Sequence, residues 1–323
     1  MVLRMKGFFR FLFSLAACFA AALVLFFAAG TYVWIGLPSY YEQNYQKGLV
    51  KQYRALQKSD PTEPKILVIG DSSMAFSVDS AQLSKATGMP CYTLGMQGGM
   101  GKEYVFDLAK PYINEGDIVI HPYTGYNAGY FGTDLILLSV ENEPDLYFDY
   151  LFKHPFEMLA RLKDRCVVKL VATAKGETEG EGVDFYKAEA FDETGNMTYY
   201  RPAGRYASSL EESDHYFFYA GMYSQRDIDK VNAYTAYCKE KGATFLLTSG
   251  VVYRDHVDNT EEDLEKFEAW FRSVFDAPLI VDKWSDNHFE KKLMYDTAIH
   301  ANSNGMKAYT QNLYEDLLPY LAR

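Results

Sequence analysis

Three residue types that together support acyl transfer occur along this chain in the order serine, aspartate, histidine. Ser72 follows Gly70 and Asp71 directly after a short apolar run, and Asp296 lies four residues before His300 near the C-terminus. A serine hydroxyl becomes a nucleophile when a histidine accepts its proton, and a carboxylate orients that histidine and stabilises its protonated form. The pattern therefore predicts a triad of Ser72, His300 and Asp296 that works through an acyl-serine.

Other residues of the same types leave alternatives open. The neighbouring Ser73 is a second serine, but we expect its side chain to face away from the crevice. His288 also follows an aspartate, Asp286, and His121 ends an apolar run and is a candidate second participant. We favour His300 as the base because it has an aspartate four residues upstream and is followed by a loop that turns into a helix.

An acyl transfer also needs hydrogen-bond donors for the developing oxyanion, because removing one such donor typically slows the reaction by roughly 10²–10³. The candidates are Ser72 itself, Gly98 in the glycine-rich loop 95–101, and the side-chain amide of Asn127. Glycines leave backbone N–H groups accessible that a bulkier residue would hide. For Asn127, a purely structural place in an aromatic turn is an equally good interpretation.

The segments around these residues alternate between strand and helix patterns. Lys65 to Ile69 is typical of a strand buried on both faces. The expected strands are 65–69, 91–94, 118–121, 243–248 and 278–281, and the expected helices are 80–87, 102–112, 227–241, 261–275 and 305–321. This alternation predicts an α/β fold, a flavodoxin-like doubly wound parallel sheet of about five strands with flanking helices. Ligands bind such sheets at the carboxyl ends of the strands.

An insertion at about residues 128–226 interrupts this alternation. It contains one expected helix pair, 147–175, and an irregular part rich in tyrosine. We expect the insertion to cover the carboxyl edge of the sheet. Most of its tyrosines should pack the insertion itself, although aromatic faces also stack well on sugar rings.

The N-terminus has the composition of a membrane anchor. An uncharged apolar run from Phe11 to Leu37 follows three basic residues, Arg4, Lys6 and Arg10. About 20 apolar residues suffice for a helix to cross a bilayer, and basic residues favour the cytoplasmic side. We expect a single-pass helix with the rest of the chain outside the cytoplasm. A cleaved signal ending at Ala28-Ala29-Gly30 and a lipoprotein at Cys18 are the alternatives.

The domain organisation predicted from these patterns is an anchor at residues 1–37, a helical stalk at 38–64 and a catalytic domain at 65–323. The net charge of the whole chain is −11, so the exported part, which lacks the three basic residues of the anchor, carries −14. This acidity argues against nucleic acid as a partner. The three remaining cysteines, Cys91, Cys166 and Cys238, have no metal-like spacing, and we expect neither a metal nor a cofactor. They are expected to be isolated thiols, with one disulfide as the alternative.

Three blocks of sequence together resemble the SGNH (GDSL-like) hydrolase superfamily. They are Gly70-Asp71-Ser72, Thr93-Leu94-Gly95-Met96-Gln97-Gly98, and Asp296-Thr297-Ala298-Ile299-His300-Ala301-Asn302 with Gly305 after it. Within that superfamily the chain resembles the membrane-anchored branch of teichoic-acid D-alanyl transfer and polysaccharide O-acetylation proteins. The resemblance covers about residues 65–127 and 227–321. It departs from the superfamily at 122–127, where Pro-Tyr-Thr-Gly-Tyr-Asn replaces the usual Gly-x-Asn-Asp.

This resemblance implies an extracytoplasmic serine O-acyltransferase that transfers an acetyl or similar group to a cell-envelope polysaccharide. The implied partners are that glycan, as acceptor, and a polytopic membrane-bound O-acyltransferase that brings the acyl group across the bilayer. Two alternatives stay open. The same residues with water as acceptor make an esterase that removes acyl groups from glycans, and a non-catalytic accessory of the membrane acyltransferase needs no chemistry at all.

Overall fold

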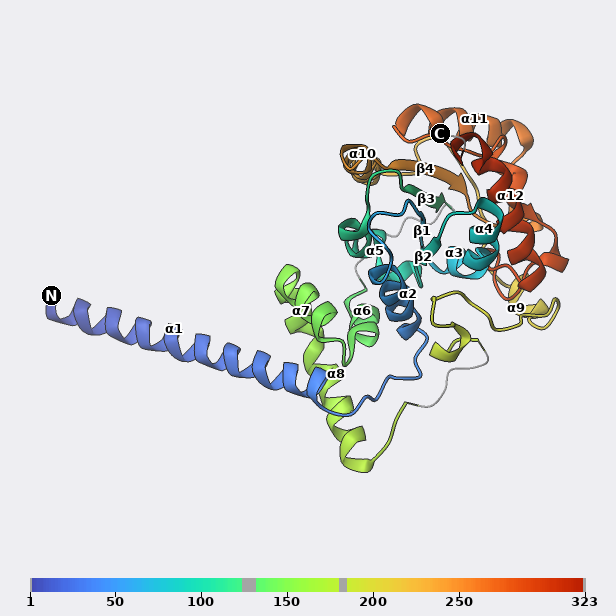
Figure 1. Cartoon of the computed structure of the whole chain (residues 1–323). Coiled ribbons are helices and arrows are strands. Elements are labelled where there is room, and N and C mark those ends of the chain that lie inside the picture. Colours follow the sequence, from blue (N-terminus) through green and yellow to red (C-terminus); the bar gives the residue numbers. More distant parts are fainter. Residues whose placement is uncertain (1, 124–131, 180–184, 322–323) are drawn as a thin grey trace. The chain divides into compact units, whose positions relative to one another are not determined.

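The computed structural model describes residues 2–123, 132–179 and 185–321 (Figure 1). The chain divides into two compact units. The first, which we call the helical unit, consists of Met1–Asn44 and Thr133–Glu181, and the second, the sheet unit, consists of Tyr45–Gly132 and Gly182–Arg323. The insertion expected at 128–226 is thus shared between the two units.

The sheet unit is built on a parallel sheet of four strands. These are β1 (Ile66–Ile69), β2 (Cys91–Leu94), β3 (Ile118–Tyr123) and β4 (Thr244–Ser249), in the spatial order β2-β1-β3-β4. The four residues of β1 are all buried, as expected for a strand covered on both faces. Because the strand order reverses beside β1, the crevice at its carboxyl end is the place where α/β sheets usually bind ligands.

Helices cover both faces of this sheet (Figure 1). On one face lie α3 (Ser72–Ser77), α4 (Ser80–Thr87) and α12 (Ser303–Leu321), whose apolar side chains form one buried cluster with the sheet. On the other face lie α5 (Lys102–Ala109) and α10 (Gln225–Glu240), where Phe106 stacks on Tyr234 with ring centroids 4.1 Å apart. The α/β class and the flanking helices predicted from the sequence are confirmed.

The prediction of a fifth strand at 278–281 is wrong. Residues 278–281 form no strand, and Leu279 makes a single parallel bridge to Leu247. Proline has no N–H to donate to a ladder, and Pro278 contributes only its carbonyl, which accepts from the Leu247 N–H at 2.8 Å. The pairing ends after the Ile280 N–H donates to the Leu247 carbonyl at 2.9 Å. A separate small parallel sheet pairs β5 (Val252–Tyr253) with β6 (His288–Phe289).

Local signals in the sequence set most helix boundaries. Asp79 caps α4 by accepting from the Gln82 N–H, and Gly88, with φ 74°, ends that helix. Thr260 and Asp263 form a capping box at the start of α11 (Glu261–Val274). The remaining helices of this unit are α2 (Lys47–Gln57) and α9 (Ala207–Glu211).

Helix α2 lies in the segment expected to be a stalk, and it packs into the sheet unit. Leu49, Gln52 and Leu56 are buried, and α2 contacts β2. The Gln52 side-chain oxygen accepts from the Gly95 N–H at 2.9 Å, at the start of the glycine-rich loop. This part of the chain therefore supports the loop that follows β2.

The helical unit contains α1 (Val2–Thr31), a π-helical turn (Tyr32–Gly36), α6 (Thr133–Val140), α7 (Pro144–Lys153) and α8 (Pro155–Lys175). Among the described residues, one helical stretch, Gly7–Gly36, has the length and the apolar composition needed to cross a membrane. Its 30 residues exceed the roughly 20 that a bilayer requires.

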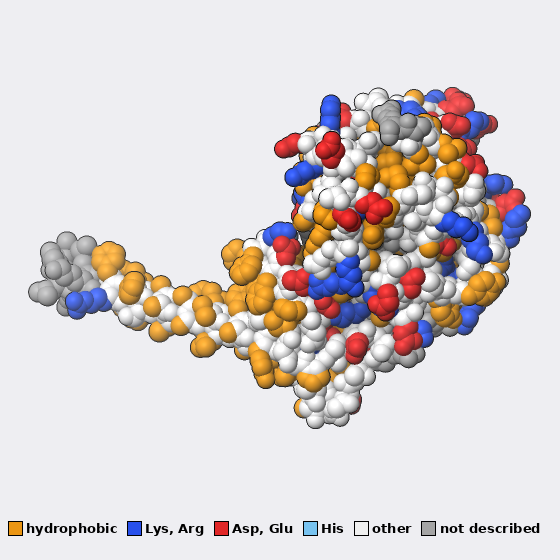
Figure 2. Space-filling model, in the orientation of Figure 1, with side chains coloured by type: hydrophobic (Ala, Val, Ile, Leu, Met, Phe, Trp, Pro, Cys, Tyr) orange, Lys and Arg blue, Asp and Glu red, His pale blue; other side chains and the backbone are white. Residues whose placement is uncertain are grey.

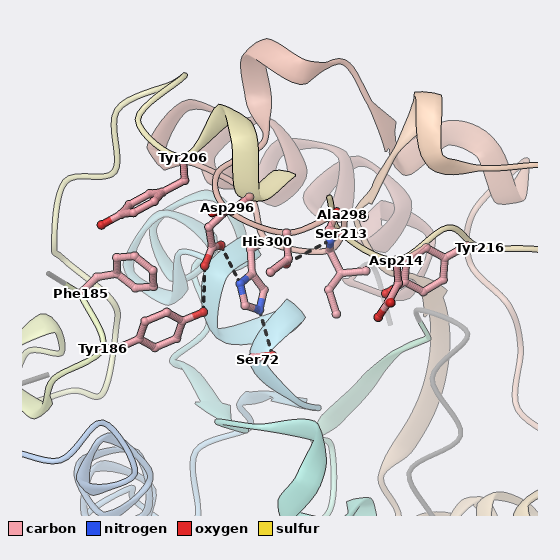
Figure 3. Close-up of a pocket in the computed structure, with 13 residues that line it drawn as sticks. Ser72, Phe185, Tyr186, Tyr206, Ser213, Asp214, Tyr216, Asp296, Ala298 and His300 are labelled. Carbon is pink, nitrogen blue, oxygen red and sulfur yellow. Dashed lines mark hydrogen bonds and ion pairs between the residues drawn. The ribbon is translucent and has the colours of Figure 1, made fainter. Parts of the chain in front are cut away.

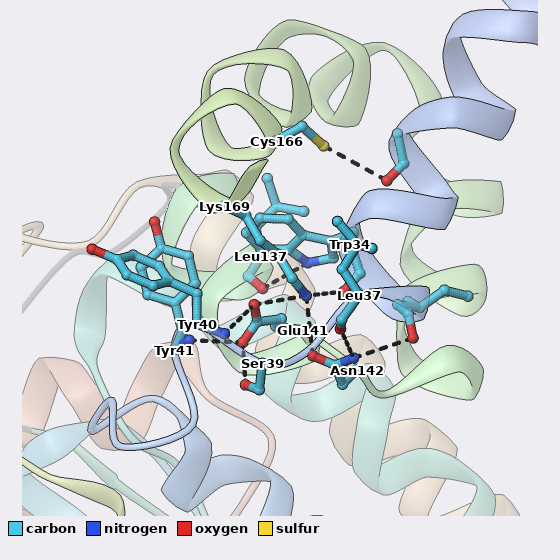
Figure 4. A network of polar contacts seen from close by, with 12 residues as sticks. Trp34, Leu37, Ser39, Tyr40, Tyr41, Leu137, Glu141, Asn142, Cys166 and Lys169 are labelled. Atoms are coloured by element: carbon cyan, nitrogen blue, oxygen red, sulfur yellow. Dashed lines mark hydrogen bonds and ion pairs between the residues drawn. The ribbon is translucent and has the colours of Figure 1, made fainter. Parts of the chain in front are cut away.

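A buried ion pair fixes the segment after α1 (Figure 4). The Lys169 ammonium lies 2.8 Å from a Glu141 oxygen, and both side chains are inaccessible to solvent. Glu141 also accepts from the N–H groups of Tyr40 and Tyr41, and Lys169 donates to the Trp34 carbonyl. Burial opposes ionisation of Glu141, but these hydrogen bonds together hold the pKa of its carboxyl below the usual range. All four cysteines, Cys18, Cys91, Cys166 and Cys238, are free.

Candidate active site

The structure brings Ser72, His300 and Asp296 into one hydrogen-bonded chain (Figure 3). The Ser72 Oγ lies 2.9 Å from His300 Nε2, and His300 Nδ1 lies 2.9 Å from Asp296 Oδ1. Because a carboxylate only accepts hydrogen bonds, Nδ1 carries the imidazole proton and Nε2 is left to accept from the serine. His300 and Asp296 are buried, while Ser72 is only partly buried. The serine is therefore the member of this chain that an incoming molecule reaches.

The turn between β1 and α3 positions Ser72. Asp71 caps α3 and accepts from both the N–H and the hydroxyl of Ser73, at 2.9 and 2.6 Å. This contact engages Ser73 in a buried hydrogen bond and leaves Ser72 as the first residue of the helix. Gly95 lets the loop after β2 approach this turn, because a Cβ there would lie 2.3 Å from the Gly70 carbonyl oxygen. The glycine thus serves the close backbone packing behind the serine.

A closed loop between η7 (Lys291–Leu293) and α12 positions the acid and the base. The Tyr295 N–H donates to the His300 carbonyl at 2.9 Å. Asn302 caps α12 by accepting from the Gly305 N–H at 3.0 Å, and its amide nitrogen donates to the Met294 carbonyl at 3.0 Å. Gly305 has no space for a side chain, because a Cβ would lie 2.2 Å from the Leu293 carbonyl oxygen. The Asn and Gly after the histidine are thus structural residues of this loop.

Two residues that the sequence did not single out support the imidazole. Phe76, from α3, stacks on the His300 ring with centroids 3.9 Å apart and an angle of 10° between the planes. The guanidinium carbon of Arg201 lies 5.2 Å from the centroid of the Phe76 ring. Its nitrogens donate to the carbonyls of Phe76 and Ala301, at 3.0 and 3.2 Å. Burial lowers the pKa of Arg201 to about 10, so the side chain remains a buried cation at neutral pH.

A third such residue, Tyr186, holds the carboxylate. Its hydroxyl donates to Asp296 Oδ2 at 2.9 Å, so that both oxygens of Asp296 are engaged. Burial opposes ionisation of Asp296, but the hydrogen bonds from His300 and Tyr186 hold its pKa below the usual range. Burial raises the pKa of Tyr186, and the charge of Asp296 raises it further. Tyr186 belongs to the irregular part of the insertion, where no periodicity in the sequence marks one tyrosine over another.

In comparisons with known proteins, no family model, no curated protein and no solved structure matches this chain. The chemistry of the site is therefore argued from its own geometry.

The alternative histidines lie elsewhere. Asp286 accepts from the Lys283 N–H at 2.8 Å. Burial and the nearby Arg254 lower the pKa of His288 to about 4, so this histidine is neutral. His121 donates from Nδ1 to the Ile69 carbonyl at 2.6 Å, and burial lowers its pKa to about 3. Neither His288 nor His121 lines the pocket beside Ser72.

The three proposed oxyanion donors differ in position. The Ser72 N–H belongs to the first turn of α3, where backbone N–H groups have no acceptor within the helix. Gly98 begins the 3₁₀ turn Gly98–Met100 and is not among the described residues that line the pocket beside Ser72, so its role stays a prediction. Asn127 lies outside the described residues.

A pocket of about 590 Å³ opens beside the triad (Figure 3). Ser72, Asp296 and His300 contribute to its wall, and the second half of the insertion supplies most of the rest: Phe185, Tyr186, Tyr206, Ser209, Ser213, Asp214 and Tyr216. Two carboxylates, Asp214 and Asp296, line the pocket, and none of its described lining residues is a lysine or arginine. The wall thus suits a neutral or cationic molecule with hydroxyl groups better than an anionic one.

Proposed function

We propose that this protein is a membrane-anchored serine acyltransferase of the SGNH type, which transfers an acetyl or similar group to a cell-envelope polysaccharide outside the cytoplasm. The observation that carries the proposal is the hydrogen-bonded chain from Ser72 through His300 to Asp296. The parallel sheet of four strands, with the serine directly after β1, is compatible with this superfamily. A polytopic membrane-bound O-acyltransferase would be the partner that supplies the acyl group.

The reaction proceeds in two halves. In the first, the Ser72 Oγ attacks the acyl carbonyl while its proton moves to His300 Nε2, and the leaving group takes that proton as the carbonyl re-forms. In the second, an acceptor hydroxyl gives its proton to His300 and attacks the acyl-serine, which releases Ser72 with its proton restored. Asp296 stays ionised throughout and stabilises the imidazolium. The Ser72 and Gly98 N–H groups are the proposed donors to the oxyanion.

The pocket supports a glycan as acceptor. Tyr206 and Tyr216 offer aromatic faces with polar ends, a combination suited to sugar rings. The hydroxyl groups of Ser209 and Ser213 add hydrogen-bonding capacity along the same wall. The carboxylate of Asp214 disfavours an anionic substrate there and accepts from sugar hydroxyls or an ammonium group.

Removal of acyl groups by hydrolysis is the second candidate function. Ser72 is partly exposed, and the pocket beside it opens to solvent, so water has access to an acyl-serine. An esterase and a transferase differ in whether water or a sugar hydroxyl reaches the acyl carbonyl first.

The test is to detect the acyl-serine directly. The full-length protein in detergent is exposed to an activated aryl acetate, and its peptides are analysed by mass spectrometry. We expect an added acetyl group on Ser72, absent in Ser72→Ala and retained in the matched variant Ser209→Ala, which alters another serine of the same pocket. Product analysis with and without an oligosaccharide then distinguishes transfer from hydrolysis. If the native protein never acquires the acetyl group although it and both variants are folded, the result supports the non-catalytic accessory instead.

A further inference from the structure

Helices α7 and α8 of the helical unit expose an unusual amount of apolar surface. Seven large apolar side chains on these two helices are exposed, and we call them the apolar face of α7 and α8: Phe148, Phe152, Phe156, Val167, Val168, Leu170 and Val171. Phe152 and Phe156 are 79 and 80 % exposed, and Phe148 stacks on Phe152. Contiguous exposed apolar patches mark sites of membrane or protein interaction.

The end of α1 is fixed against these same helices. Gly30 packs on α8, where a Cβ on this glycine would lie 2.7 Å from a methyl carbon of Leu162. The Thr31 hydroxyl lies 3.0 Å from the hydroxyl of Tyr147 on α7. Figure 1 shows α8 running across the end of α1 rather than along it, and Figure 2 shows apolar side chains continuing from α1 onto the adjoining helices.

The length of α1 places this junction at the membrane surface. Arg10 is the last charged residue before the apolar run, and a helix rises 1.5 Å per residue. Twenty residues beyond Arg10 is Gly30, about 30 Å away, which equals the thickness of the hydrocarbon core. If α1 spans the bilayer, its contact with α8 therefore falls at the boundary between hydrocarbon and headgroups.

We infer that the apolar face of α7 and α8 inserts into the outer boundary of the lipid bilayer beside α1, as a second, interfacial membrane contact. The inference rests on the membrane-anchored part of the proposed function. A bilayer is favoured over a protein partner because the face is continuous with the apolar surface of α1. Between Cys166 and Ala174 the one charged residue, Lys169, is buried and paired with Glu141. On α7, the exposed charges beside Phe152, Asp149 and Lys153, pair with each other at 2.9 Å. The contact is thus mainly apolar and should not depend on salt, unlike adsorption by charge.

Spin labels on the full-length protein test this inference. One cysteine for labelling replaces Phe152 or Phe156 in a background with Cys18→Ala and Cys91→Ser, in which the remaining native cysteines, Cys166 and Cys238, are buried. The protein is placed in phosphatidylcholine nanodiscs. Each nitroxide is scored by its collisions with oxygen, which partitions into lipid, and with a water-soluble nickel chelate. We expect labels at 152 and 156 to be relaxed more strongly by oxygen than by the chelate, with the same result at 50 mM and at 1 M salt. Because both side chains are exposed, the substitutions should leave the fold intact.

Two further labels separate failure of this inference from failure of the anchor. Leu25→Cys in α1 should report lipid if α1 spans the bilayer, and Glu262→Cys on exposed α11 should report water in every case. Lipid at 25 with water at both 152 and 156 would overturn the inference, leave the anchor intact and point to a protein partner for the apolar face. Water at 25 as well would remove the anchor itself, and the inference with it.

Discussion

Replacing Asp296 by asparagine in the presence and absence of the Tyr186 hydroxyl tests how the candidate base is oriented. In the native site Tyr186 donates to one oxygen of Asp296, and His300 Nδ1 donates to the other. An asparagine at 296 has one acceptor and one donor. Tyr186 will retain the oxygen, because turning the amide round leaves the buried tyrosine O–H without an acceptor. The NH₂ group then points at His300 Nδ1 and forces the imidazole proton onto Nε2, where it blocks acceptance of the serine proton.

The magnitude follows from the two hydrogen bonds. In a Ser-His-Asp triad the wrong tautomer costs about 10⁴ in turnover, and we expect this loss in Asp296→Asn. Leaving a buried donor unsatisfied costs about 1–3 kcal/mol, which is the preference that Tyr186 imposes on the amide. Tyr186→Phe removes the preference, so the double variant Tyr186→Phe/Asp296→Asn should recover about 5- to 150-fold over Asp296→Asn alone. Tyr186→Phe by itself keeps the carboxylate and should lose no more than about tenfold.

The assay is the rate of aryl acetate cleavage by the full-length protein, measured for the native chain, both single variants and the double variant. Asp286→Asn is the matched control, because Asp286 is the aspartate next to the alternative histidine and bonds the Lys283 N–H instead. Near-native activity in Asp296→Asn would refute the role of this carboxylate. A double variant no faster than Asp296→Asn would refute the claim that Tyr186 selects the amide orientation.

Three other outcomes are expected. Arg201→Met leaves the carbonyls of Phe76 and Ala301 without their buried donor and should destabilise the protein by about 3 kcal/mol or more in denaturant titrations; a loss under 1 kcal/mol would contradict this. The pKa of His288 is lowered by burial to about 4, below its unfolded value near 6.5, so the unfolded chain binds a proton that the folded chain does not. Stability should therefore fall by about 1.5 kcal/mol between pH 6.5 and pH 5 because of this residue, and His288→Gln should reduce that slope. Alkaline phosphatase fused after the C-terminus should be active, and a reporter that works only in the cytoplasm should be inactive; the reverse pattern would exclude an extracytoplasmic site.

Most boundaries of the strands and helices in the sheet unit could be predicted from the sequence. Short apolar runs and capping residues such as Asp79 and Gly88 act over a few residues, so the first four strands and their helices fall close to the predicted ranges. The prediction of a fifth strand failed because pairing with β4 needs N–H donors, and Pro278 has no N–H group. The helical unit was not foreseen as a unit, since buried Glu141 and Lys169 join residues 133–181 to the segment after α1, about 100 positions earlier. They do so by hydrogen bonds to the backbone of Tyr40, Tyr41 and Trp34.

The sequence by itself determined the candidate nucleophile Ser72 and the turn that carries it, because Gly70, Asp71 and Ser72 act through local backbone geometry. Only the tertiary structure decided which aspartate meets which histidine, and it paired His300 with Asp296 rather than His288 with Asp286. It also supplied Tyr186 and Arg201, which come from an irregular insertion and act through contacts with residues at least 100 positions away in the chain. Contacts of that kind have no period and no spacing rule, since they depend on where two distant segments of the folded chain meet.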